Sequence, residues 1–162
     1  MWGRSKKVPV EAGSPAPPFQ LKDLHGADIS LGQILGKGPA LLAFYKISCP
    51  VCQLTFPFLE RLAASSSVQI VGISQDDSSA TQAFNQRFGV TFPTLLDQSK
   101  DGYPASNAFG ISSVPAMFLV EPDGHIAKVI GGFSKRDLEA LGDRAGLQMF
   151  RKDENVPEWK AG

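Results

Sequence analysis

The sequence has only two cysteines and two histidines among its 162 residues, and it has no excess of charge of either sign. Sixteen Lys and Arg residues balance sixteen Asp and Glu residues, so no basic surface is expected for nucleic acid or an anionic membrane. No apolar run approaches the roughly 18 residues of a membrane-spanning helix, and the first ten residues lack the apolar core of a signal peptide. We therefore predict no nucleic-acid partner and no membrane segment. The chain as written is expected to be cytoplasmic, or extracytoplasmic if an export segment was removed.

Length and composition predict one globular domain. Hydrophobic residues make up 43% of the chain and charged residues 20%, which is typical of a protein with its own core. The first 19 residues hold four prolines, and residues 1–13 are predicted to be a flexible tail. Residues 149–162 are polar and aperiodic, which predicts a second tail. The folded unit is therefore expected over residues 14–148.

Apolar runs and helical periods alternate along this unit. Residues 39–45, with the run ALLAFY, and residues 68–74, VQIVGIS, are typical of strands buried on both faces. The dipeptide Asp123–Gly124 predicts a turn between antiparallel strands at 116–120 and 126–130. The other predicted elements are a hairpin at 20–31, a helical turn ending at Gly36, helices at 49–64, 78–88, 103–109 and 135–147, and a strand at 94–97. This order predicts an α/β sandwich with parallel and antiparallel strands.

The two cysteines, Cys49 and Cys52, are three residues apart where a buried strand meets a helix. Cys49 is expected to be the N-cap, where its sulfur accepts hydrogen bonds from free amides at the positive end of the helix. Both effects favour the thiolate, which is the form that attacks a disulfide. Pro50 suits the first helical position because it loses no useful donor there. Cys52 lies one turn deeper on the same side, where it can resolve a mixed disulfide.

The alternatives for this pair are half of a zinc site and two inert core thiols. Structural zinc needs four ligands, whereas the chain adds only His25 and His125, each within a predicted hairpin turn. Free cysteine is often a small core residue, although the strand-to-helix position argues against that role. Asp76 and Asp77 could bind a cation, but capping of the next helix together with Ser78 explains them better. No phosphate-binding loop is present, so we predict neither a metal nor another cofactor.

Several segments follow one another as they do in a known protein group. They are GSPAPPFQLKDLHG, LLAFYKISCPVCQLTFPFLERL, VQIVGIS, FGVTFPTLLD, FGISSVPAMFLVEPDGHI and VIGGFSKRDLEAL. From about Ser14 to Leu141 the chain resembles the thioredoxin-like redoxins of AhpC/TSA type, in particular the thiol:disulfide oxidoreductases of cytochrome c maturation. The resemblance implies a thioredoxin-like three-layer sandwich with a mixed central sheet, an N-terminal hairpin and an inserted helix and strand.

The resemblance also implies roles for particular residues. Cys49 would be the attacking cysteine and Cys52 the resolving one. Pro115 matches the proline that the group keeps cis beside the cysteines, and the backbone of Val114 would pair with an extended substrate segment. Gly131 matches the small residue that flanks the substrate groove. The alternative for Pro115 is an ordinary proline at a strand start, and the alternative for Gly131 is an ordinary glycine at a strand end.

Three departures from the group's pattern limit what is carried over. Ser48 and Pro50 flank the first cysteine and belong to the predicted substrate surface, but Ser48 stands where the group often has tryptophan. Ala43 replaces the buried acid of thioredoxins, and Thr55 replaces a glutamate that is frequent in cytochrome c maturation proteins. Water or Lys46 would then accept the proton of the deeper thiol, and Lys46 could also favour the thiolate of the first. The alternative for Lys46 is a solvated residue at a strand end.

A peroxidase is the main alternative function. Peroxiredoxins place proline and a threonine or serine seven and three residues before the peroxidatic cysteine. Relative to Cys49 these positions hold Leu42 and Lys46. Relative to Cys52 they hold Tyr45 and Cys49, so the motif fails in either register. A peroxiredoxin-like antioxidant enzyme stays an alternative because a low-pKa thiolate reacts with peroxide without the motif.

We therefore predict a thiol:disulfide oxidoreductase that acts through the CPVC pair and needs no bound cofactor. Its expected partners are protein thiols or disulfides and a redox donor or acceptor protein. A redox-sensing or binding module without enzymatic activity is the third possibility.

Overall fold

The computed structural model describes residues 8–65 and 67–162 of the chain. Most of the predicted N-terminal tail, residues 1–7, lies outside this description. In the described part, no helix combines the length and the apolar character needed to cross a membrane.

The core of the fold is a mixed seven-stranded sheet with the strand order β2-β1-β5-β4-β3-β6-β7. Its strands are β1 (Gln20–Asp23), β2 (Asp28–Ser30), β3 (Ala40–Tyr45), β4 (Gln69–Ser74), β5 (Thr94–Leu96), β6 (Ala116–Val120) and β7 (Ile126–Gly131). Strands β3, β4 and β5 are parallel, whereas β1 and β2, β1 and β5, β3 and β6, and β6 and β7 pair antiparallel. The predicted α/β sandwich with a mixed sheet is confirmed.

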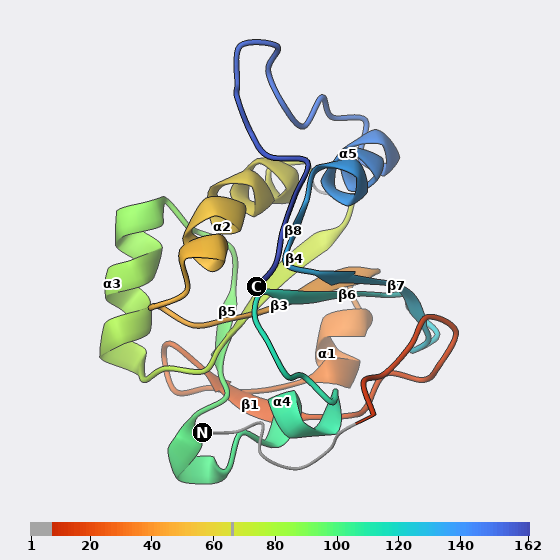
Figure 1. The fold of residues 1–162 in the computed structure, drawn as a ribbon. Helices are drawn as coiled ribbons and strands as arrows, with labels where there is room; N and C mark the ends of the chain where they lie inside the picture. Colours follow the sequence, from red (N-terminus) through yellow and green to blue (C-terminus); the bar gives the residue numbers. More distant parts are fainter. Residues whose placement is uncertain (1–7, 66) are drawn as a thin grey trace.

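Helices cover both faces of the sheet (Figure 1). They are α1 (Leu31–Leu35), α2 (Pro50–Ala63), α3 (Ser78–Phe88), α4 (Pro104–Ala108) and α5 (Lys135–Arg144), with a short 3₁₀ turn, η1 (Ser99–Asp101). Helices α2, α3 and α5 lie on one face, and α1 and α4 lie on the other. The connections from β3 to β4 and from β4 to β5 cross to the next parallel strand in the same direction along the sheet. Because such crossovers are right-handed, α2 and α3 lie on the same face.

All six residues of strand β3 are completely buried. On one face, the ring of Phe44 packs against Phe109 and Phe118, with centroids 5.2 and 5.8 Å away. On the other face, Tyr45 packs against Phe56 of α2 at 4.2 Å. This packing fixes where β3 ends and α2 begins, which is the junction that carries the two cysteines.

The last residues of the chain differ from the tail that their sequence predicts. Met149 and Phe150 are buried, and Trp159–Lys160 forms a strand, β9, that pairs antiparallel with β8 (Phe133–Ser134). Helix α5 ends at Arg144 rather than at residue 147, because Gly146 has a φ of +69° and turns the chain. The chain is therefore free to fold back over the domain.

The first described residues also contact the domain. The amide of Val10 donates to the carbonyl of Phe109, and the amide of Gly13 donates to that of Ile126. Pro15 forms an isolated bridge with His125.

Candidate active site

The two cysteines lie at the N-terminus of α2, directly after the carboxyl end of β3. Cys49 is the N-cap in extended conformation, and its sulfur accepts a hydrogen bond from the amide of Cys52 at 3.1 Å. Pro50 is the first helical residue. The predicted capping geometry is confirmed, and it places the sulfur of Cys49 among the free amides of the helix.

Cys49 is only half-buried, and its environment favours the thiolate. The largest cause is a hydrogen bond from the Cys52 thiol. The amides of Cys52 and Val51 and the positive charge of Lys46 act in the same direction, whereas partial burial opposes them. Together they lower the pKa of Cys49 to about 7. About half of the Cys49 side chains are then ionised at neutral pH.

Cys52 has the opposite environment, since its side chain is fully buried. Burial raises the pKa of Cys52 well above that of a free thiol, and the neighbouring Cys49 and the charge of Asp76 raise it further. The two sulfurs are therefore differentiated, with an accessible thiolate at Cys49 and a protonated thiol at Cys52. Thiol-disulfide exchange needs this division, with one sulfur that attacks as a thiolate and a second that stays protonated until it resolves the mixed disulfide.

A second loop lies against the first cysteine. The Cys49 thiol donates to the carbonyl oxygen of Val114 at 3.3 Å, and the bond between Val114 and Pro115 is cis, as predicted. Gly131, at the end of β7, is exposed with open space where a side chain would lie. It pairs with Ala116, directly after Pro115. The structure thus brings together residues from three separate parts of the sequence, around positions 49, 114 and 131.

The other predicted residues have more peripheral places. Ser48 is exposed beside the first cysteine, and Lys46 is half-buried at the start of the loop. Ala43 is buried in the centre of β3. Thr55 is also fully buried, and its hydroxyl donates to the carbonyl of Val51 at 2.7 Å, within its own helix. Neither position supplies an acid to the deeper thiol.

The two aspartates after β4 take different roles, although the sequence gives them the same one. Asp77 caps α3 and accepts from the amide of Ala80 at 2.8 Å. Asp76 instead turns toward residues 46–49, the cysteine loop between β3 and α2, where it accepts from the amide of Ile47 at 2.8 Å. The signal for Asp76 is its position after a parallel strand adjacent to β3, since such strands end at the same edge of the sheet.

Within residues 8–65 and 67–162 there is no group of three or more histidine, cysteine, aspartate or glutamate side chains that could hold a metal ion. His25 lies in the turn after β1, and His125 lies directly before β7, where it forms the bridge with Pro15.

Comparison with known proteins assigns the family. Residues 12–129 match the model of the AhpC/TSA family. The chain belongs to this family. Over 130 residues it is 33% identical to the thiol-disulfide oxidoreductase ResA of Bacillus subtilis, a match that covers 78% of this chain and 70% of the relative.

Solved structures agree with this family assignment. The structure of dsbF from Mycobacterium tuberculosis is 32% identical with a TM-score of 0.67, and the match covers 78% of this AhpC/TSA protein and 94% of that chain. The thioredoxin domain of a thiol-disulfide oxidoreductase from Bacteroides vulgatus is 24% identical with a TM-score of 0.74 and confirms the fold, covering 83% and 97% of the two chains. Relatives, fold and paired cysteines together make this protein an oxidoreductase of the thiol-disulfide class.

Proposed function

We propose that this protein exchanges electrons with the thiols or disulfides of other proteins, with Cys49 as the attacking residue and Cys52 as the resolving one. The observation that carries the proposal is the contrast between the two sulfurs. Cys49 is accessible with a pKa lowered to about 7, whereas Cys52 is buried with a raised pKa. The amide of Cys52 holds the first sulfur at 3.1 Å, so the two residues stay within reach of each other.

The exchange takes place in two displacement steps. The Cys49 thiolate attacks one sulfur of the partner's disulfide, that bond breaks, and the departing sulfur leaves as a thiolate that takes up a proton. Cys52 then loses its proton and attacks the sulfur of Cys49, which releases the partner's second sulfur. Two electrons have passed to the partner, and Cys49 and Cys52 are joined by a disulfide. A protein dithiol restores the pair by the same steps in reverse.

The surroundings of Cys49 supply the proposed binding surface. The backbone of Val114 would pair with an extended segment of the partner, between Gly131 on one side and Ser48 and Pro50 on the other. Pro115 leaves no amide that would compete for that segment. Lys46 would tune the reaction through its charge, which lowers the pKa of Cys49.

The peroxidase alternative has less support in this geometry. Leu42 stands where peroxiredoxins have their proline, and it is fully buried in β3, away from any peroxide at Cys49. Lys46 replaces the threonine or serine that would activate the O–O bond. We therefore expect slow peroxide turnover.

A trapping experiment tests the assignment of the two cysteines. A peptide with an internal disulfide is mixed with Cys52→Ser and, in parallel, with Cys49→Ser, and adducts are measured by mass spectrometry. Cys52→Ser should accumulate a stable mixed disulfide at Cys49, since nothing resolves it. Cys49→Ser should form almost none, because its only thiol is buried. Adducts on Cys52 alone would reverse the two roles.

A further inference from the structure

The segment after α5 is fixed to the outside of the domain by its first half. The ring of Phe150 packs against Phe58 of α2, with centroids 4.9 Å apart. Arg61, also on α2, donates to the carbonyl of Met149 at 3.1 Å. It also forms a bidentate ion pair with the carboxylate of Glu154, with N–O distances of 2.7 and 2.5 Å. Residues 149–154 therefore anchor the segment near the C-terminal half of the helix that carries the cysteines.

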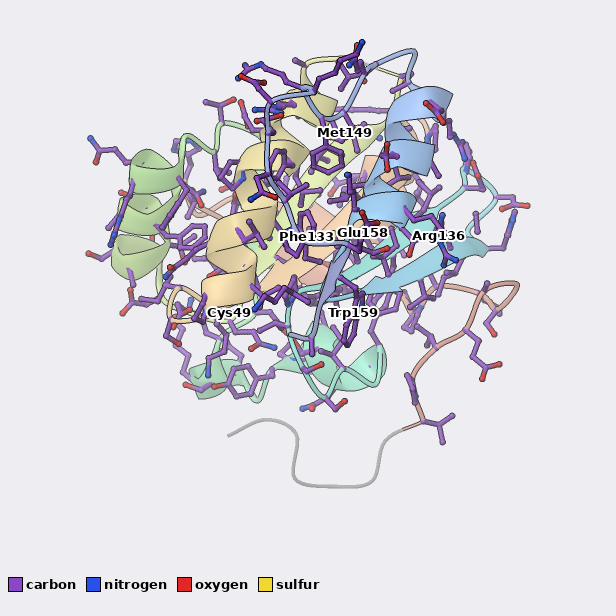
Figure 2. The ribbon with its side chains drawn as sticks, turned by 45° about the horizontal axis from the view of Figure 1, so that its top comes forward. Cys49, Phe133, Arg136, Met149, Glu158 and Trp159 are labelled. Atoms are coloured by element: carbon purple, nitrogen blue, oxygen red, sulfur yellow. The ribbon has the colours of Figure 1, made fainter. Side chains whose placement is uncertain are left out.

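The second half of the segment runs from this anchor toward the cysteine end of the molecule (Figure 2). The carbonyl of Glu158 accepts from the amide of Lys135 at 3.0 Å, and Trp159 and Lys160 pair with Ser134 and Phe133. In Figure 2 the chain passes from Met149 at one end to Trp159 at the end that carries Cys49. We call residues 158–162 the strap.

The strap ends on the loop that contacts the first cysteine. A Cβ atom on Gly162 would collide with the carbonyl of Val114 and lie 3.2 Å from the nitrogen of Pro115. A Cβ atom on Gly132 would collide with the carbonyl of Lys160. The strap therefore lies backbone against backbone on Val114, two residues before β6, and on Gly132, directly after β7. It approaches the same carbonyl that accepts from the Cys49 thiol.

We propose that the strap is an intramolecular competitor for the substrate groove, which a protein partner must displace before its own extended segment can pair with Val114. This inference rests on the proposed function. A small disulfide needs no backbone pairing, and Cys49 is partly accessible with the strap in place. The strap would therefore slow the exchange with proteins and leave the exchange with small disulfides unchanged.

The contacts of the strap suit an element that opens. Its strand has two residues, all five residues of the strap are exposed, and Trp159 is 61% exposed. Short exposed pairings lie at the low end of local stability, whereas the anchor holds buried aromatic rings. The strap can therefore lift while residues 149–154 keep the segment attached.

One variant separates the strap from the chemistry. Gly162→Val places a side chain against the carbonyl of Val114 and should push the strap off the groove, whereas Ala161→Val places the same valine side chain at the adjacent exposed position. With the Gly162→Val protein, we expect insulin disulfide reduction to rise about three- to tenfold in kcat/KM, and reaction with dithiobis(nitrobenzoic acid) to change by less than about twofold. The Ala161→Val protein should behave like the original protein in both assays.

A second measurement does not depend on turnover. In Cys52→Ser, a peptide or a small thiol is trapped on Cys49, and amide hydrogen exchange is followed by mass spectrometry. The trapped peptide should accelerate exchange in residues 158–162 but not in residues 149–154, and the small thiol should accelerate neither. Equal insulin reduction by Gly162→Val and the original protein, or unchanged exchange in the peptide adduct, would overturn the strap. Failure of every variant to reduce insulin or to form the adduct would instead overturn the proposed function on which the strap rests.

Discussion

Cys49 and Cys52 lie three residues apart at the two ends of the first turn of α2, yet the environments of their thiols are opposite. The sulfur of Cys49 is partly exposed and lies near the helix amides and the charge of Lys46, and the pKa of its thiol is lowered to about 7. At Cys52 the helix enters the core, and burial raises the pKa of the thiol. A single hydrogen bond from the amide of Cys52 to the sulfur of Cys49 joins the two residues. One turn of helix at the surface of a packed sheet is therefore enough to produce two thiols with opposite chemistry.

The buried side of this comparison depends on aromatic packing. Phe56, one turn below Cys52, is fully buried between Tyr45, Phe84 and Phe92, with ring centroids 4.2 to 5.8 Å away. We expect Phe56→Ala to lower the free energy of unfolding by about 3–5 kcal/mol, measured by urea denaturation. Gln53→Ala is the control on the surface side and should cost about 1 kcal/mol, since it loses one hydrogen bond to Ile47. Equal losses in the two variants would contradict the contrast.

The exposed side can be measured through pH. Because the pKa of Cys49 is about 7, alkylation of Cys49 by iodoacetamide should accelerate about tenfold between pH 6 and pH 8 and then level off. The folded-state pKa lies below that of an unfolded thiol, so ionisation of Cys49 stabilises the fold at high pH, and this contribution is lost as the pH falls through about 7. Cys52 should stay unlabelled over this range. A midpoint of the pH dependence of Cys49 alkylation near the pKa of free cysteine would contradict the difference between the two thiols.

The link between the two thiols can be weakened directly. The Cys52 thiol is the largest cause of the lowered pKa at Cys49, so Cys52→Ala should raise that pKa and slow alkylation at pH 7 by about fivefold. Cys52→Ser keeps a donor at the same place and should recover part of the rate. If both variants react as fast as the original protein, then the helix terminus alone sets the pKa.

Much of this site can be predicted from sequence because local rules decide it. A cysteine followed by proline after a buried strand specifies an N-cap, and the Asp123–Gly124 turn specifies the hairpin of β6 and β7. The approach of Val114 and Gly131 to Cys49 follows from the family resemblance, which carries the sheet topology that local patterns lack.

The parts that could not be predicted depend on contacts between distant residues. Strands β8 and β9 have two residues each and pair across about 25 positions, so neither shows an alternating pattern. Glu154 is a polar residue in a polar segment, and only the folded structure reveals Arg61 beside it. The two aspartates after β4 look equivalent in sequence, and the direction of each side chain is decided by the neighbouring loop.

That pair of aspartates offers the finest test of the contrast between the cysteines. Asp76 is half-buried, accepts from the amide of Ile47 in the cysteine loop, and contributes a negative charge that raises the pKa of Cys52. Asp77 is exposed and caps α3. Asparagine keeps the acceptor oxygen and the capping ability of both residues while removing the charge.

We expect Asp76→Asn to lower the pKa of Cys52 slightly and to speed the resolving step by about two- to threefold, since the thiolate of Cys52 no longer forms beside a negative charge. Asp77→Asn should leave that step unchanged, because the Asp77 carboxylate is exposed and accepts from the amide of Ala80 in α3. The resolving step is measured in both variants by rapid quenching of the mixed disulfide with a peptide. Slower resolution in Asp76→Asn would contradict this expectation and would mean that the carboxylate takes the proton of Cys52, a role that neither Ala43 nor Thr55 can fill.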